Sequence, residues 1–345
     1  MQTSFARYLI GFAAALAGVL LAAWLYVYSF PMAFLESGYP SWVAKSMMLR
    51  DCRIGRIALF GDSRLEAGVV PALLPVDAAN FGLGAATAVE IHSAVGRALG
   101  CAPLPRQVVL SLAPEHFGPL DQYFWLNDLR YGFISFAELL EAERVAAALG
   151  DTQSFGTAKT PDGLSGPVRD WLYAIRFPSF YIGSLAGGRL FGRQGSNDDR
   201  LAKVMQARGF WEYRSTGTPP PRGEPLAPRF DRTPLQTAEF EQTLDLLRDK
   251  AVPVGLLIMP VSEDTSAGAD AAYLAYLQSL TERFPNVSLI SEDIPRWPKR
   301  LFVDGIHMTG AAARLFTERL AACTTAGKIQ PPCDLRWRET AFRQP

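Results

Sequence analysis

Three residues that lie far apart in the sequence have the side-chain types needed for nucleophilic catalysis. Ser63 stands in a Gly-Asp-Ser-Arg segment, directly after a short apolar run over 54–60 that predicts a strand. A serine hydroxyl is a weak nucleophile until a nearby base removes its proton. The candidate base is His307 in an Asp-Gly-Ile-His segment, where Asp304 can fix the imidazole tautomer and stabilise its cation. We therefore expect these residues to form a triad that performs acyl-ester chemistry.

The elements that must position this triad are short strands alternating with helices. Such alternation predicts an α/β fold, a parallel sheet with helices on both faces. In open α/β sheets, ligands bind beyond the carboxyl ends of the strands, which is where the first strand would place Ser63. The predicted strands cover 54–60, 78–84, 107–112, 252–259 and 287–290, and the predicted helices cover 86–99, 233–250, 271–284 and 310–321.

Composition and charge exclude several classes of ligand. The 345 residues include 34 basic and 34 acidic side chains, so no basic face for nucleic acid is expected. The sequence has no C-x-x-C pair and no glycine-rich nucleotide motif. We therefore expect no metal and no cofactor. Of the histidines other than His307, His92 falls on a predicted helix and is interpreted as structural.

The N-terminal region predicts a membrane anchor. Residues 8–30 contain no charged side chain and are long enough to cross a bilayer as a helix. Arg7 precedes them, so the positive-inside tendency keeps the N-terminus cytoplasmic and exports the rest. A cleaved signal peptide would be shorter and would not end in the aromatic stretch Trp24–Tyr28. A buried globular helix would show a polar stripe, which is absent.

Four cysteines fit an exported domain. Cys52 and Cys101 each lie just before a predicted strand, so they could form a disulfide if those strands are parallel neighbours. Cys323 and Cys333 are close in sequence and could form a second one. Four buried free thiols are the alternative, since an oxidising compartment is itself inferred.

The chain divides into an anchor, a linker, a catalytic domain and a tail. Residues 118–232 break the alternation, and we expect this insertion to cover or extend the active-site face. It contains a helix over 135–148, a proline-rich stretch over 218–228, and Trp125, which could stack on a sugar ring. The expected boundaries are 1–30 for the cytoplasmic tip and anchor, 31–53 for the linker, 54–322 for the catalytic domain with its insertion, and 323–345 for the tail.

Together these segments resemble the SGNH/GDSL hydrolase superfamily. That family carries its nucleophile in a Gly-Asp-Ser block after the first strand and an Asp-x-x-His block before the last helix. The stretch Asn80–Gly84 is similar to its second block, in which a glycine supplies an oxyanion-hole N–H. The resemblance implies a three-layer, flavodoxin-like SGNH fold. It also implies that the N–H groups of Ser63 and Gly82 are the oxyanion donors.

The third block departs from the family pattern. Where the family has Gly-x-Asn-Asp, this chain has Ser111–Phe117, so the asparagine donor is missing. Ser111 or His116 could replace it, although a structural role is equally consistent with either residue. Arg64, beside the nucleophile, is a candidate substrate-binding residue.

The anchor, the altered third block and a Pro-Val-Ser segment at 260–262 resemble a narrower branch. Its members work beside membrane-bound O-acyltransferases in alginate or cellulose acetylation or in teichoic-acid D-alanylation. The resemblance implies an O-acyltransferase, most simply an O-acetyltransferase. It would be held in the bacterial inner membrane by residues 8–30, with a periplasmic catalytic domain, an O-acyltransferase partner and an exported polysaccharide as acceptor. An esterase using the same triad and a catalytically silent scaffold are the alternatives.

Overall fold

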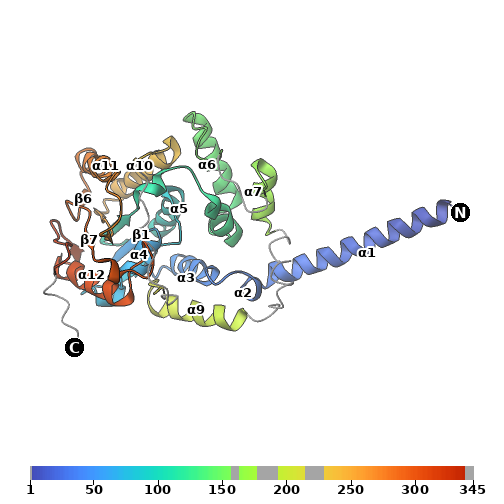
Figure 1. Ribbon diagram of the computed structural model, residues 1–345, viewed down its shortest axis with the longest axis horizontal. Coiled ribbons are helices and arrows are strands. Elements are labelled where there is room, and N and C mark those ends of the chain that lie inside the picture. The colour runs from blue at the N-terminus through green and yellow to red at the C-terminus, as the bar shows by residue number, and fades with distance from the viewer. Residues whose placement is uncertain (1, 157–162, 177–192, 214–228, 339–345) are drawn as a thin grey trace.

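A five-stranded parallel sheet forms the centre of the structure, a computed structural model that describes residues 2–156, 163–176, 193–213 and 229–338 (Figure 1). The strand order is β2-β1-β3-β4-β6, and every neighbouring pair is parallel. This confirms the predicted α/β class. The strands are β1 (Ile57–Gly61), β2 (Ala78–Asn80), β3 (Gln107–Ser111), β4 (Val254–Leu256) and β6 (Val287–Leu289).

The strands contribute side chains to two hydrophobic cores, one on each face of the sheet. Successive side chains of a strand point to opposite faces of the sheet. Ala58 and Phe60 accordingly belong to one buried cluster, and Ile57 and Leu59 to the other. The first cluster includes side chains of α3 (Tyr39–Arg50), α5 (Ala88–Leu99), α6 (Phe136–Ala148), α10 (Pro234–Asp249) and α11 (Asp270–Arg283). The second includes side chains of α4 (Ser63–Gly68) and α12 (Gly310–Ala322).

The segment expected to be a linker is part of the folded domain. After α2 (Pro31–Phe34), helix α3 packs against α9 (Gln194–Gln206) and α5. Trp42 and Met48 of α3 lie in the first core, and Lys45 is fully buried. A disulfide joins Cys52, just after α3, to Cys101, just before β3. The expected linker 31–53 therefore contains a helix, α3, that packs on the domain it connects to the anchor.

The described part of the expected tail, residues 323–338, packs on the domain. A hairpin of β8 (Thr324–Thr325) and β9 (Lys328–Ile329) follows α12. The second disulfide joins Cys323 to Cys333, and Trp297 Nε1 donates a hydrogen bond to the carbonyl of Leu335 over 2.9 Å.

Other short elements connect these helices and strands. They are η1 (Pro71–Leu73), η2 (Pro114–Phe117), η4 (Lys299–Leu301) and a two-stranded sheet of β5 (Val261–Ser262) and β7 (Arg296–Trp297).

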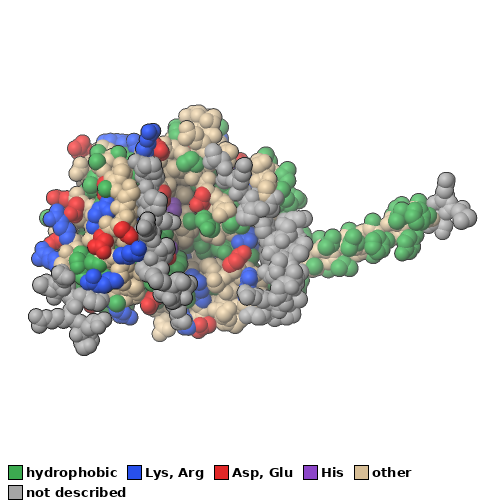
Figure 2. Space-filling model, in the orientation of Figure 1, with side chains coloured by type: hydrophobic (Ala, Val, Ile, Leu, Met, Phe, Trp, Pro, Cys, Tyr) green, Lys and Arg blue, Asp and Glu red, His purple; other side chains and the backbone are tan. Residues whose placement is uncertain are grey.

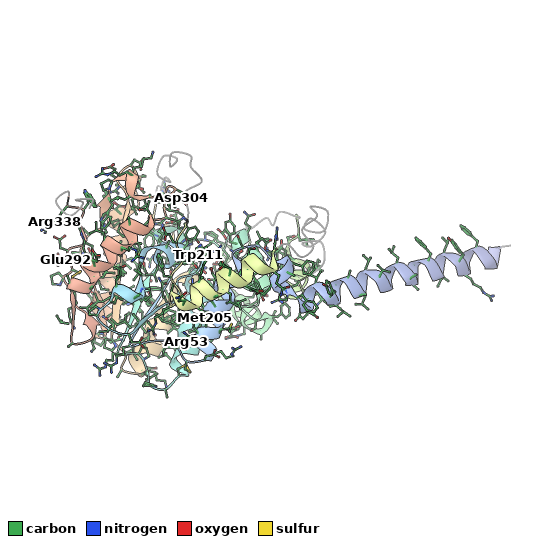
Figure 3. All side chains as sticks on the ribbon, turned by 90° about the horizontal axis from the view of Figure 1, so that it is seen from below. Arg53, Met205, Trp211, Glu292, Asp304 and Arg338 are labelled. Carbon is green, nitrogen blue, oxygen red and sulfur yellow. A yellow bond between two sulfur atoms is a disulfide. The ribbon has the colours of Figure 1, made fainter. Side chains whose placement is uncertain are left out.

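The insertion after β3 forms η3 (Phe124–Leu129), α6, α7 (Gly166–Ala174) and α9. Figure 3 shows α9 running from near the base of α1 to the neighbourhood of Trp211. Beyond α9, the carbonyl of Arg208 accepts a hydrogen bond from the N–H of Asn80 over 2.9 Å, which fixes the insertion to the edge strand β2. The proline-rich stretch 218–228 lies outside the described residues.

Helix α1 (Gln2–Ser29) projects away from the rest of the protein (Figure 1). Its Phe5–Ser29 portion is long and apolar enough to cross a membrane. The last turns of α1 contact the folded domain. Val27 is buried there, and Trp24 Nε1 donates a hydrogen bond to the carbonyl of Ile175 over 3.0 Å.

Candidate active site

Ser63, His307 and Asp304 form a continuous chain of hydrogen bonds. The Ser63 Oγ lies 2.8 Å from His307 Nε2, and His307 Nδ1 lies 2.7 Å from Asp304 Oδ2. Both distances are within the normal hydrogen-bonding range. In this arrangement Nε2 can take the hydroxyl proton while the carboxylate holds the opposite side of the ring. The structure therefore brings the three predicted residues together with the geometry of a nucleophile, a base and an orienting acid.

Local backbone geometry fixes the position of Ser63. β1 ends at Gly61, where a Cβ would collide with the Ser111 carbonyl of β3, so the close approach of these strands needs glycine. Asp62 then caps α4, its Oδ1 accepting a hydrogen bond from the Arg64 N–H over 2.8 Å. Its Oδ2 accepts another from the Ala113 N–H over 3.0 Å. Ser63 is the first residue of the helix and lies just beyond the end of β1.

The loop before α12 fixes the acid and the base relative to each other. Asp304 Oδ1 accepts hydrogen bonds from the N–H groups of Ile306, over 2.9 Å, and His307, over 2.7 Å. Burial by itself raises the pKa of Asp304. The hydrogen bonds and the positive charge from His307 outweigh that effect and leave the pKa of Asp304 below its ordinary value. The carboxylate therefore stays ionised and able to stabilise an imidazolium at neutral pH.

Tyr213, in the part of the insertion that follows α9, covers one face of the His307 imidazole. The two ring centroids are 4.2 Å apart and the ring planes differ by 9°. The Tyr213 hydroxyl donates a hydrogen bond to Glu66 Oε2 over 3.0 Å. Sequence reasoning did not single out Tyr213, although it expected the insertion to extend the active-site face. Its position depends on how the insertion packs against β2 and α4.

Glu66, which accepts the hydrogen bond from the Tyr213 hydroxyl, also belongs to a buried ion pair. Glu66 of α4 pairs with Lys45 of α3 at 2.6 Å, and both side chains are almost completely buried. Lys45 Nζ also donates a hydrogen bond to the Gly82 carbonyl. Lys45 thus connects α3 with α4, which carries the candidate nucleophile Ser63, and with the loop after β2. None of these long-range contacts has a local signal in the sequence.

The two expected oxyanion-hole donors, the N–H groups of Ser63 and Gly82, differ in whether they already have a hydrogen-bond partner. Ser63 is the first residue of α4, where a backbone N–H has no partner within the helix, and no other partner lies in the described part of the chain. The Gly82 N–H, in contrast, donates to Asn80 Oδ1 over 2.9 Å. The Gly82 backbone also lies so close to the start of α4 that a Cβ would be 2.8 Å from the Asp62 carbonyl oxygen. The second expected donor therefore lies beside α4, and its N–H is already hydrogen-bonded.

The residues considered as replacement donors lie near Asp62. Ser111 is the last residue of β3 and is buried, and His116 Nε2 is 3.6 Å from Asp62 Oδ2. Ser111, Asp62 and Arg64 line a narrow cavity of about 20 Å³, room for about one water molecule. Ser111 and His116 therefore both lie near Asp62, the residue that caps α4.

Two expected substrate-binding residues are held inside the protein. Arg64 is 5% exposed and forms an ion pair with Glu115, although its Nε has no hydrogen-bond partner among the described residues. Trp125 is fully buried, and its Nε1 donates a hydrogen bond to Asp170 Oδ1 over 2.6 Å. The expectation that Trp125 stacks on a sugar is corrected, because neither face of a buried ring is open to a ligand.

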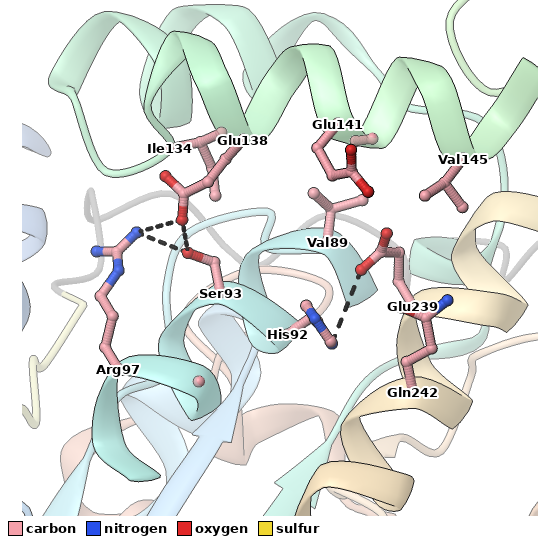
Figure 4. A pocket seen from close by; sticks show the side chains of 12 residues that line it. Val89, His92, Ser93, Arg97, Ile134, Glu138, Glu141, Val145, Glu239 and Gln242 are labelled. Carbon is pink, nitrogen blue, oxygen red and sulfur yellow. Dashed lines mark hydrogen bonds and ion pairs between the residues drawn. The ribbon is translucent and has the colours of Figure 1, made fainter. Parts of the chain in front are cut away.

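A second, larger cavity of about 460 Å³ lies between α5, α6 and α10 (Figure 4), and its lining includes no residue of the triad. His92 is in this cavity, 3.8 Å from Glu239 and 3.2 Å from the hydroxyl of Thr243. Burial, and then the negative charges of Glu141 and Glu90, raise the pKa of Glu239 to about 7. Within residues 2–156, 163–176, 193–213 and 229–338, no group of three or more His, Cys, Asp or Glu side chains could hold a metal ion.

Comparisons with known proteins give no relative of this chain. Neither the family models, nor the curated proteins, nor the solved structures give a match to the chain. The function of the site therefore has to be argued from its own residues.

Proposed function

We propose that this protein is a membrane-anchored acyltransferase that moves an acyl group, most simply acetyl, onto a hydroxyl of an exported polysaccharide. The observation that carries the proposal is the hydrogen-bonded chain from Ser63 through His307 to Asp304. The resemblance to the SGNH/GDSL superfamily supports it, as does the order of the five strands, which is the flavodoxin-like 2-1-3-4-5 order. We infer a three-layer SGNH-like domain on this basis.

The first half-reaction forms an acyl-enzyme. The Ser63 Oγ attacks the carbonyl carbon of the acyl donor while its proton passes to His307 Nε2. The tetrahedral intermediate then collapses, the bond to the leaving group breaks, and His307 returns the proton to that group. The product is an ester between the acyl group and Ser63. Asp304 stays ionised and stabilises the imidazolium formed in between.

The second half-reaction transfers the acyl group. A sugar hydroxyl gives its proton to His307 Nε2 as its oxygen attacks the acyl carbonyl. The new ester forms, the bond to the Ser63 Oγ breaks, and the proton returns to that oxygen. If water takes the place of the sugar, the same steps hydrolyse the ester. Transfer and hydrolysis therefore differ only in the acceptor that reaches the acyl-enzyme.

The oxyanion side of the site supports a second candidate function. Of the two backbone donors implied by the resemblance, the Gly82 N–H is already bonded to Asn80. A site with only the Ser63 N–H would lack one donor, and removing one such donor costs about 3–4 kcal/mol of transition-state stabilisation. This favours, as the alternative, a scaffold that keeps the fold without turnover. In an active enzyme, Gly82 must share or release its bond when the substrate binds.

We place the triad outside the cytoplasmic membrane of a bacterium, with α1 as a single-pass anchor. A membrane-bound O-acyltransferase would then supply the acyl group, as the resemblance implies. The length and apolar composition of α1 support this placement. The two disulfides support an oxidising compartment.

The test uses the full-length protein in detergent with an activated acetyl ester, with and without acetyl-acceptor oligosaccharides. We expect acetyl on Ser63 by mass spectrometry and acetylated sugar as the product. The Ser63→Ala variant should lose at least about a thousand-fold in rate. The matched control is Ser279→Ala on α11, whose hydroxyl donates a hydrogen bond to the Tyr276 carbonyl of the same helix; it should retain full activity.

The remaining outcomes separate the alternatives. Acetate released without sugar product, across a panel of acceptors, would assign an esterase. A third outcome is that neither acyl-Ser63 nor turnover is detected and the polysaccharide of the cell is unchanged in the Ser63→Ala strain. That outcome would contradict both enzyme functions and assign the scaffold.

A further inference from the structure

Helix α7 exposes two large apolar side chains and buries two charged ones. Arg169 and Asp170 are each only 3% exposed, whereas Val168 is 61% exposed and Trp171 is 54% exposed. A surface helix of a soluble domain normally shows the opposite pattern, with the apolar stripe against the core. At these four positions α7 therefore has the reverse of the usual pattern.

Specific contacts fix the inward face of α7. Asp170 Oδ1 accepts hydrogen bonds from Trp125 Nε1 over 2.6 Å and from Arg169 Nε over 2.9 Å. The Arg169 guanidinium lies 3.7 Å from the centroid of the Trp125 ring. Tyr173, on the same side, is fully buried. The helix cannot rotate its apolar face into the domain without breaking the Trp125–Asp170 hydrogen bond and moving Arg169 off the Trp125 ring.

The outward face forms one continuous stripe. Val168, Trp171, Leu172 and Ile175 follow each other at i, i+3, i+4 and i+7, so they lie along one side of the helix and its last turn. Leu172 and Ile175 are half-buried, and the other two are exposed. This stripe resembles the apolar side of helices that lie in a membrane interface, where tryptophan is favoured.

The stripe ends at the membrane-proximal end of α1. The carbonyl of Ile175 accepts the hydrogen bond from Trp24, which lies in the aromatic last turns of α1. The guanidinium of the next residue, Arg176, lies 5.3 Å from the ring centroid of Tyr28. Figure 1 shows α7 beside the base of α1 and crosswise to it. Figure 2 shows hydrophobic side chains gathered over α7 on the side from which α1 leaves the domain.

We propose that α7 lies in the headgroup region of the membrane crossed by α1, with Val168 and Trp171 inserted among the lipids. A lipid surface is the occupant because the stripe ends where α1 leaves the domain and runs crosswise to α1. This proposal rests on the membrane anchor of the proposed function, though not on its chemistry. A second attachment point beside α1 restricts tilting of the domain and so sets the height of the triad above the bilayer.

The test measures the surroundings of the stripe in the full-length protein reconstituted in phosphatidylcholine–phosphatidylglycerol vesicles. Because all four native cysteines are paired, a new cysteine carries the only free thiol for a nitroxide spin label. Labels at Val168→Cys and Trp171→Cys report collisions with oxygen, which concentrates in lipid, and with a water-soluble nickel chelate. Leu16→Cys in α1 is the lipid control, and Leu246→Cys on α10, 37% exposed, is the aqueous control.

We expect the ratio of oxygen to nickel collisions at 168 and 171 to be several-fold higher than at 246 and to approach that at 16. Ratios equal to that at 246, with position 16 in lipid, would overturn the inference and leave the anchor intact. Shielding of 168 and 171 from both reagents would also overturn it, in favour of a protein partner. An aqueous reading at position 16 would contradict the anchor itself. Val168→Cys keeps the test valid if Trp171→Cys fails to fold.

Discussion

The ring of Tyr213 stacks on the imidazole of His307, with centroids 4.2 Å apart and planes 9° from parallel. The contact covers one face of the proposed base and leaves Nδ1 and Nε2 free to bond Asp304 and Ser63. Burial, and then the charge of Glu66, raise the pKa of Tyr213 well above its ordinary value. Its hydroxyl therefore remains a hydrogen-bond donor to Glu66 at neutral pH and well above it.

Removing the Tyr213 ring should slow the reaction without removing the nucleophile. An aromatic face stabilises a desolvated cation by up to about 2 kcal/mol, and this ring also restricts rotation of the imidazole. We expect Tyr213→Ala to lower kcat by roughly 10- to 30-fold with little change in KM. Tyr213→Phe, which keeps the ring, should stay within a few-fold of the native rate. Steady-state kinetics with an activated ester measure both, and equal rates for Tyr213→Ala and the native protein would refute the role.

Removing one partner of the buried Lys45–Glu66 ion pair should destabilise the protein more than neutralising both. Burial lowers the pKa of Lys45, and the charge of Glu66 opposes that shift. Lys45→Met leaves the Glu66 carboxylate buried without its cation, so we expect the free energy of unfolding to fall by about 3–5 kcal/mol. Adding Glu66→Gln should restore most of it. Urea titration of the detergent-solubilised protein measures the changes.

The matched control for Lys45 is Lys203→Met on α9. Lys203 pairs with Asp199 at 2.6 Å, but both side chains are more than half exposed. Exposed pairs contribute little, so this change should stay within about 1 kcal/mol. Equal losses for the two lysines would show that burial of the Lys45 pair is unimportant.

Glu239 should make stability fall as the pH rises from about 5 to 8. Its pKa in the folded protein, about 7, is above the ordinary value of 4.5, so the folded state holds a proton that the unfolded chain has lost. The stability from this group is complete below the unfolded pKa and is lost as the pH rises through the folded pKa. Glu239→Gln should therefore be more stable than the native protein at pH 8, by on the order of 2–3 kcal/mol, and similar to it near pH 4. Parallel denaturation curves at the two pH values test this, and an advantage that does not change with pH would contradict it.

The two disulfides should contribute unequally. Cys52 and Cys101 are separated by 49 positions, and Cys323 and Cys333 by 10. Loop-closure entropy predicts losses of about 4 and about 3 kcal/mol when each pair is changed to serine. Denaturation of the two double variants compares them, and a larger loss for the shorter loop would contradict the entropic explanation.

The sequence determined those parts of the protein that depend on local patterns. Apolar runs and helical spacing placed the strands near 54–60 and 107–112 and the helix near 310–321, because backbone hydrogen bonding and side-chain periodicity act over a few residues. The apolar N-terminal helix was predictable for the same reason. The Gly-Asp-Ser and Asp-x-x-His segments predicted a nucleophile, an acid and a base from their residue types and from their places after the first strand and before the last helix, and the structure brings these side chains together.

Only the tertiary structure decided what surrounds Ser63 and His307. Tyr213 reaches the imidazole because the insertion packs on β2 and α4, and Lys45 reaches Glu66 because α3 folds into the core. The inverted face of α7 depends likewise on its buried contacts with Trp125. These are contacts between residues distant in the sequence, whose free energy comes from packing and burial of groups with no local pattern in common. The sequence by itself therefore determined the candidate nucleophile, base and acid, while the fold decided what holds them in place.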